Sequence, residues 1–119
     1  MFKWIKKKIS QNINSEMDGC IIQNYNFIHT VQAKRFALHE DVDDDIFDNL
    51  LKILYSTEQI DKSKKPGDNF TPKENDILLE ANKYCRNVWT NYFKQSAFSF
   101  DKEFPTNKLN VDKNETQVF

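Results

Sequence analysis

Residues 71–97, TPKENDILLEANKYCRNVWTNYFKQSA, decide the fold of this chain because they carry its clearest helical signal. Thr71 and Glu74 are spaced as a capping box, and Pro72 stands at the first helical position, where its missing N–H is tolerated. Apolar residues then recur at helical spacing: Ile77, Leu78, Ala81, Tyr84, Cys85, Val88, Trp89 and Tyr92. The sequence therefore predicts one long helix over residues 72–97.

Residues 43–57 predict a second helix. Asp43, Asp44 and Asp45 supply an N-cap and first-turn acids, which interact favourably with the positive end of a helix dipole. An apolar stripe follows at helical spacing: Ile46, Phe47, Leu50, Leu51, Ile53 and Leu54. The polar residues 58–70 contain the only Pro-Gly pair, which is typical of a surface loop between two helices.

The N-terminal residues 2–13 predict a short amphipathic helix. Its apolar side carries Phe2, Ile5, Ile9 and Ile13, and lysines flank that side. A basic helix of this kind can lie on an anionic membrane, where Phe2, Trp4, Ile5 and Ile9 would make the contact. Because so few apolar anchors bind a membrane weakly, we favour packing on the rest of the bundle.

Residues 16–38 allow two interpretations. As a helix, they place Met17, Cys20, Ile21, Tyr25, Phe27, Ile28, Val31 and Leu38 on one broad face. The abundance of β-branched and aromatic residues is typical of strands, so a two-stranded antiparallel element at 20–38 is the alternative. We favour the helix, because the two Gly of the chain make tight hairpins hard to build.

The fold class expected from these segments is mainly α, a small bundle of about four helices at 2–13, 16–38, 43–57 and 72–97. The alternative is an α+β fold with the two-stranded element. After the long helix, we expect an extended stretch that ends at Pro105 and contains Phe98, Phe100 and Phe104. We expect one helical domain at 1–105 and a disordered tail at 106–119, where apolar anchors are few.

The chemistry-bearing residues predict no catalytic, cofactor or metal site. His29 and His39 are the only histidines, and no His-x-x-x-His or Glu-x-x-His spacing occurs to start a metal centre. Cys20 and Cys85 are far apart in sequence and fit two reduced thiols. Two glycines cannot form a phosphate-cradling loop. We therefore expect a protein that is not an enzyme.

The predicted function is binding to another protein, as an inhibitor, immunity factor or adaptor. The stretch EDVDDDIFD at 40–48 is the densest run of one charge in the chain, and an acidic rim speeds encounter with a basic partner surface. Aromatic residues anchor interfaces. The candidate partner-binding residues are Asp43, Asp44, Asp48, Trp89, Tyr92 and Phe93, and a second copy of the chain is a further candidate partner.

The alternative function is a peripheral membrane- or nucleic-acid-associated protein that uses the basic N-terminus. The net charge of −1 argues against nucleic acid, because no global field draws the chain to phosphates. No apolar run long enough for a secretory signal follows the N-terminal lysines, so we expect a cytoplasmic location. The many Lys, Asn and Ile residues fit an AT-rich genome, as in some bacteria and phages.

Overall fold

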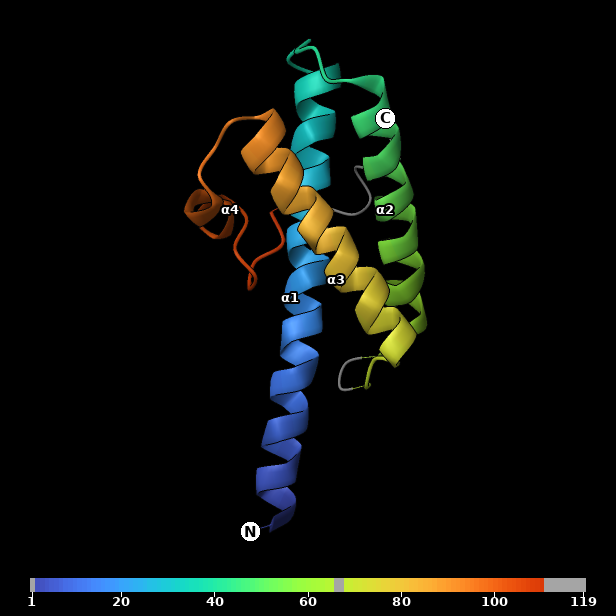
Figure 1. Cartoon of the computed structure of the whole chain (residues 1–119). Coiled ribbons are helices and arrows are strands. Elements are labelled where there is room, and N and C mark those ends of the chain that lie inside the picture. Colours follow the sequence, from blue (N-terminus) through green and yellow to red (C-terminus); the bar gives the residue numbers. More distant parts are fainter. Residues whose placement is uncertain (1, 66–67, 111–119) are drawn as a thin grey trace.

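The computed structural model describes the backbone of residues 2–65 and 68–110, and the side chains of 16–65 and 68–110. These residues form α1 (Phe2–Phe36), α2 (Asp44–Ser63), α3 (Pro72–Asn87), the π-helical η1 (Val88–Tyr92) and α4 (Ala97–Glu103). In Figure 1, α1 and α2 run antiparallel, α3 crosses them obliquely, and α4 packs beside η1. The predicted helical bundle is confirmed.

The predicted division between helices 2–13 and 16–38 is wrong, because a single helix, α1, runs from Phe2 to Phe36. Neither Pro nor Gly interrupts the chain at Asn14 and Ser15, so nothing ends the first helix there. The two-stranded alternative at 20–38 is also wrong, since residues 20–36 are helical. The amphipathic pattern of residues 2–13, with Trp4, lies outside the residues whose side chains are described.

The helix α1 lies at the centre of the bundle, with α2 and α3 both packed against it. Every residue from 23 to 29 is buried, so this part of α1 is enclosed on all sides. Tyr25, Phe27 and Ile28 supply its apolar contacts. Gln23, Asn24, Asn26 and His29 are buried as well. The amide groups of α1 therefore need partners on neighbouring elements.

The predicted helix 72–97 is too long, because the α-helical hydrogen bonding ends at Asn87. The Thr90 hydroxyl donates to the Arg86 carbonyl at 3.1 Å, and the Phe93 N–H reaches the Val88 carbonyl, which closes a π-helical turn. Lys94 then adopts a left-handed conformation with φ of 59°. The apolar periodicity continues to Ala97 in the sequence, but these hydrogen bonds and the conformation of Lys94 end the helix earlier.

The stretch predicted to be extended after Ala97 is instead the short helix α4. The Ser96 side chain caps it by accepting a hydrogen bond from the Ser99 N–H at 3.1 Å. Phe100 and Phe104 point into the core and are 0% and 4% exposed. The sequence does not indicate this helix, because seven residues make too few turns for a helical period to appear.

Phe27 of α1 is the centre of an aromatic cluster that joins three parts of the chain. Its ring lies 5.3 Å from that of Phe104, 5.7 Å from that of Phe100 and 6.3 Å from that of Trp89, measured between centroids. Phe93 completes the cluster at 6.4 Å. Edge-to-face pairs at these distances contribute stability beyond their buried area. The cluster therefore attaches η1 and α4 to α1.

A polar network beside this cluster joins the same elements. Gln23 donates to the Asp101 carboxylate at 2.8 Å and to the Phe104 carbonyl at 2.9 Å. Arg86 lies 2.6 Å from Asp101 and also donates to Asn82. The hydrogen bonds from Arg86 and Gln23 hold the pKa of Asp101 below its usual range. These contacts satisfy Gln23 and position α4 against α1 and α3.

Residues 106–110, the beginning of the expected tail, are held along α1. The Asn26 side chain donates to the Lys108 carbonyl at 2.9 Å and accepts from the Asn110 N–H at 2.9 Å. Gly19 permits this approach, since a Cβ built there would lie 3.0 Å from the Cβ of Thr106. Residues 111–119, the remainder of that tail, lie outside the described residues.

The capping box predicted at the start of α3 is confirmed. The Thr71 side chain accepts from the Glu74 N–H at 3.1 Å, and the Glu74 carboxylate accepts from the Thr71 N–H at 2.8 Å. We predict that Thr71→Ala lowers the free energy of unfolding by about 1 kcal/mol, measured by urea denaturation. Thr71→Ser is the matched control and should stay near wild type. Equal stability of Thr71→Ala and wild type would contradict a stabilising cap.

The contact between Gly19 and Thr106 makes a second prediction. Gly19→Ala should destabilise the protein, because the side chains of Gln23 and Asn26 hold the backbone on both sides of Thr106 and hinder its retreat. In a Thr106→Gly background the same change should stabilise α1 by about 1 kcal/mol, as Ala does in an ordinary helix. A thermodynamic cycle of the four chains measures this reversal. The same sign in both backgrounds would contradict the close approach.

Candidate partner-binding surface

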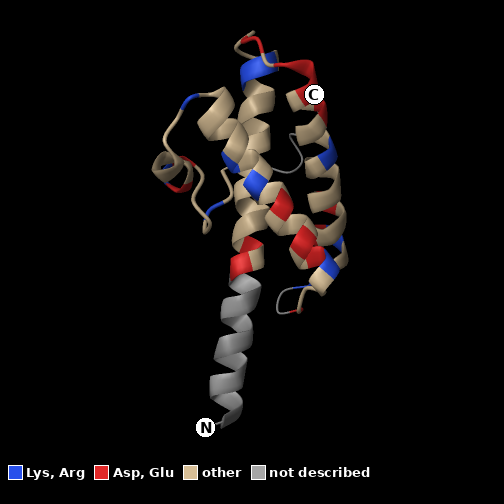
Figure 2. Cartoon of the chain, viewed as in Figure 1, with Lys and Arg blue, Asp and Glu red and all other residues tan. Residues whose placement is uncertain are grey.

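The connection between α1 and α2 forms an acidic corner, by which we mean Glu40, Asp41, Asp43, Asp44, Asp45 and Asp48. All six residues are exposed. Figure 2 shows the acidic residues gathered on this connection and the start of α2, next to the basic end of α1. A dense group of carboxylates creates a local negative field although the whole chain is nearly neutral.

Backbone hydrogen bonds fix the shape of the acidic corner. Val42 is buried and anchors its middle. The Asp43 side chain accepts from the N–H groups of Asp45 and Ile46, which confirms the predicted N-cap of α2. The Tyr92 hydroxyl accepts from the Asp43 N–H at 2.9 Å. The carboxylates therefore stand on an ordered backbone, which reduces the entropy lost when a partner binds.

A hollow of about 590 Å³ lies at the acidic corner. The hollow is lined by Arg35, His39, Glu40, Asp41, Val42, Asp43, Asp44 and Tyr92. Arg35 pairs with Asp44 at 2.6 Å and Lys34 with Glu40 at 3.5 Å. Two cations among six carboxylates leave the corner negative.

Two exposed apolar side chains stand beside the acidic corner, at the end of α1. Phe36 is 47% exposed and Leu38 is 63% exposed. The rings of Phe36 and Phe47 pack edge to face with centroids 5.5 Å apart, so Phe36 is held against α2 on one side. His39 follows in a left-handed conformation, with φ of 55°, and turns the chain toward α2. The end of α1 thus places apolar area next to the carboxylates.

The structure brings together some of the predicted partner-binding residues and separates others. Asp43, Asp44 and Tyr92 meet at the hollow. Asp48 is exposed one turn further along α2. Trp89 and Phe93 are partly buried in the aromatic cluster, although the ring of Phe93 lies 5.1 Å from that of Tyr92. Of the three aromatic residues, Tyr92 has the most direct contact with the acidic corner.

Sequence reasoning missed Phe36 and Leu38 as surface residues. Leu38 fits the apolar face of the helix predicted over 16–38. The helix ends at Phe36, because the Leu38 N–H bonds to the Ala33 carbonyl at 3.1 Å and His39 adopts a positive φ. The acidic run that starts at Glu40 was the one signal that the helix would stop here.

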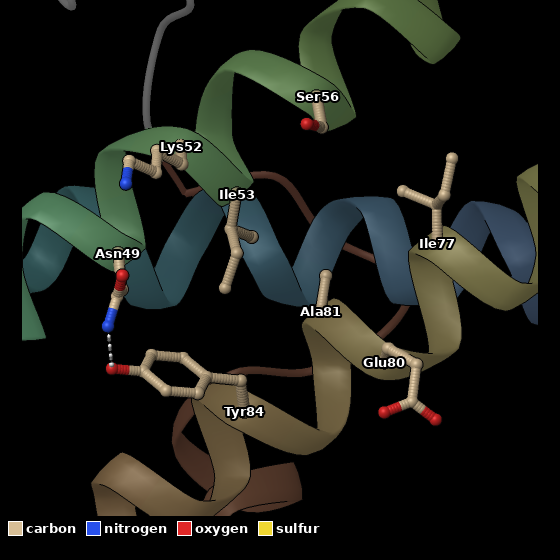
Figure 3. Close-up of a pocket in the computed structure, with 8 residues that line it drawn as sticks. All are labelled: Asn49, Lys52, Ile53, Ser56, Ile77, Glu80, Ala81 and Tyr84. Atoms are coloured by element: carbon tan, nitrogen blue, oxygen red, sulfur yellow. Dashed lines mark hydrogen bonds between the residues drawn. The ribbon is translucent and has the colours of Figure 1, made fainter.

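A second depression lies between α2 and α3, with a volume of about 420 Å³ (Figure 3). Its lining comes from one side of each helix: Asn49, Lys52, Ile53 and Ser56 of α2, and Ile77, Glu80, Ala81 and Tyr84 of α3. The Asn49 amide donates to the Tyr84 hydroxyl at 3.2 Å and closes one end. The sequence did not predict this groove, because it depends on the crossing of two helices.

No family model, curated protein or solved structure matches this chain. A function can therefore be inferred only from the described residues themselves. Among them, no helix is both long enough and apolar enough to cross a membrane. The same residues contain no group of three or more His, Cys, Asp or Glu side chains arranged to hold a metal ion.

His29 and the two cysteines have environments that oppose their charged forms. His29 is buried against Tyr25, with ring centroids 6.2 Å apart, and burial lowers its pKa. Cys85 is fully buried, and burial raises the pKa of its thiol far above the usual range. Burial also raises the pKa of Cys20. Both thiols therefore stay protonated at neutral pH, which makes them poor nucleophiles.

The Tyr92 hydroxyl makes a testable contribution to the acidic corner. We predict that Tyr92→Phe lowers the free energy of unfolding by about 1 kcal/mol, because the Asp43 N–H loses its protein partner. Amide hydrogen exchange at Asp43 should accelerate in the same variant. Tyr55→Phe, at a side chain that is 65% exposed, is the control for loss of a phenolic hydroxyl. Unchanged exchange at Asp43 would contradict the hydrogen bond.

Proposed function

We propose that this chain is a small non-enzymatic binding protein that docks the acidic corner onto a basic surface of a protein partner. The observation that carries the proposal is the pairing of an exposed carboxylate group with exposed Phe36 and Leu38 on an ordered backbone. The carboxylates steer a basic partner, while the apolar side chains beside them supply the affinity.

A protein partner fits this surface better than a small ligand does. The hollow is open and polar, and the apolar side chains stand beside it and not inside it. Small-molecule sites enclose their ligand and are lined mainly by apolar groups. Tyr92 adds an aromatic ring at the edge, a residue type enriched in interfaces. The proposed role remains that of an inhibitor, immunity factor or adaptor of bacterial or phage origin.

The environments of the two thiols and of His29 support a non-catalytic role. Cys85 and His29 are enclosed in the core, where no substrate reaches them without opening the bundle. Both cysteines are free, which suits the reducing cytoplasm that we propose as the location. The alternative function, contact with a membrane or nucleic acid through residues 1–15, rests on side chains that are not described, so no observation favours it.

The acidic corner is tested by neutralising Asp43, Asp44 and Asp48 together to Asn. Asn caps a helix as well as Asp does, so α2 should remain folded. The partner is first captured from a lysate of the native host with the wild-type chain and then purified. We predict that the association rate of the triple variant falls about tenfold at low salt and less at high salt, because steering is screened.

The matched control removes the same charge elsewhere, with Asp76→Asn, Glu80→Gln and Glu103→Gln on exposed parts of α3 and α4. It should leave association nearly unchanged. A second arm, Leu38→Ala, should speed dissociation, whereas Phe98→Ala, at an exposed side chain on α4, should not. Unchanged association of the triple Asp variant, or an equal loss in the control, would overturn the proposal.

A further inference from the structure

Residues 97–110 form a C-terminal unit that joins the rest of the chain through the short linker 93–96. The unit docks on α1, α3 and η1 through the rings of Phe100 and Phe104, the Asp101 carboxylate, and the backbone of Lys108 and Asn110. These contacts are made by the unit itself and do not involve the linker. The unit can therefore make the same docking contacts whatever path residues 93–96 take.

The linker has an unfavourable backbone conformation. Lys94 has a φ of 59°, in the left-handed region that a residue with a Cβ disfavours. It follows directly on the π-helical turn η1, itself a departure from regular helix. The Gln95 N–H bonds to the Trp89 carbonyl at 3.1 Å and completes the reversal. The chain thus turns back sharply here without the glycine that usually permits it.

The sequence across the linker would also support an uninterrupted helix. Neither Gly nor Pro occurs from Val88 to Phe104, and the apolar spacing of α3 continues to Ala97. If Lys94 and the extended Ser96 both became helical, α3 would run on into α4 and carry the C-terminal unit away from its own α1. The unit would then need the same docking site on another molecule.

We propose that two copies of this chain exchange their C-terminal units, so that residues 97–110 of each copy dock on α1 of the other. The occupant must be this same unit, because the site is shaped to it. Gly19 leaves room for Thr106, Gln23 binds the Phe104 carbonyl, and Asn26 binds both Lys108 and Asn110. Exchange keeps every one of these contacts and removes the unfavourable left-handed conformation of Lys94. Domain swapping forms dimers at low cost because the same contacts are made between two copies.

The exchange is tested by complementary charge variants of the pair Arg86–Asp101, whose atoms lie 2.6 Å apart. In Arg86→Glu two acidic groups face each other, and in Asp101→Arg two basic groups do, so each chain docks its own unit poorly. Unfolded together in equal amounts and refolded at high concentration, the two variants should form a heterodimer, seen by native mass spectrometry. Each C-terminal unit then finds an opposite charge on the other chain.

The control carries both substitutions in one chain, which restores an attractive pair within each copy. Because its own pair is attractive, this chain should refold without forming a heterodimer with either single variant. If the mixed variants give no heterodimer and melt as the sum of the separate chains, the proposal is overturned. The assay detects a heterodimer and not folding alone. A general loss of stability in one variant therefore cannot produce the expected result.

The linker gives an independent test on the otherwise intact chain. Lys94→Gly removes the backbone penalty of the closed form and should weaken dimerisation about tenfold, whereas Lys94→Ala should strengthen it by favouring the continuous helix. Lys102→Ala, on exposed α4 outside the linker, should leave the dimer dissociation constant unchanged. Sedimentation equilibrium measures all three. A chain that stays monomeric in every variant, or Lys94→Gly that dimerises more strongly, would overturn the exchange.

Discussion

The enclosure of α1 around its whole circumference from Gln23 to His29 is the constraint on which the other elements depend. A helix buried on all sides is usually apolar all round, but this one carries amides. A buried amide without a partner costs stability, so elements that cover α1 must also hydrogen-bond to it. Asn82 of α3 bonds to Gln23 and Asn24, and the C-terminal unit bonds to Gln23 and Asn26. Apolar burial alone would not determine where α4 docks.

Local signals predicted the helices that begin with a strong cap. Asp43 and Thr71 make the expected hydrogen bonds, and α2 and α3 start where the sequence indicates. Helix ends were harder to predict, because His39 and Lys94 end α1 and η1 in left-handed conformations that are not signalled by Gly or Pro. The helix α4 depends on Phe100 meeting Phe27, a contact between residues far apart in sequence. Periodicity within one segment contains no information about such a pair.

The candidate site was predictable in its charge and not in its shape. Six acids in nine residues are visible in the sequence, and they are exposed as a capping run should be. The residue type of Tyr92 predicts an interface role, but its hydrogen bond with the Asp43 N–H depends on the packing of η1 beside the start of α2. Leu38 fits the apolar face of the predicted helix, and its exposure follows from the end of α1 at Phe36. The order of the backbone at this corner is a tertiary property.

The amides of α1 also set the order in which the chain can fold during synthesis. Asn26 bonds to Asn110, and Gln23 bonds to Asp101, across most of the chain length. Contacts of such long range slow folding, because the intervening chain must be ordered before they form. While the ribosome is still making α3, the middle of α1 has only part of its cover, and its amides face water. The helix α1 is therefore completed only after residues 101–110 have been made, and until then its exposed apolar side is a site where chaperones or neighbouring nascent chains can bind.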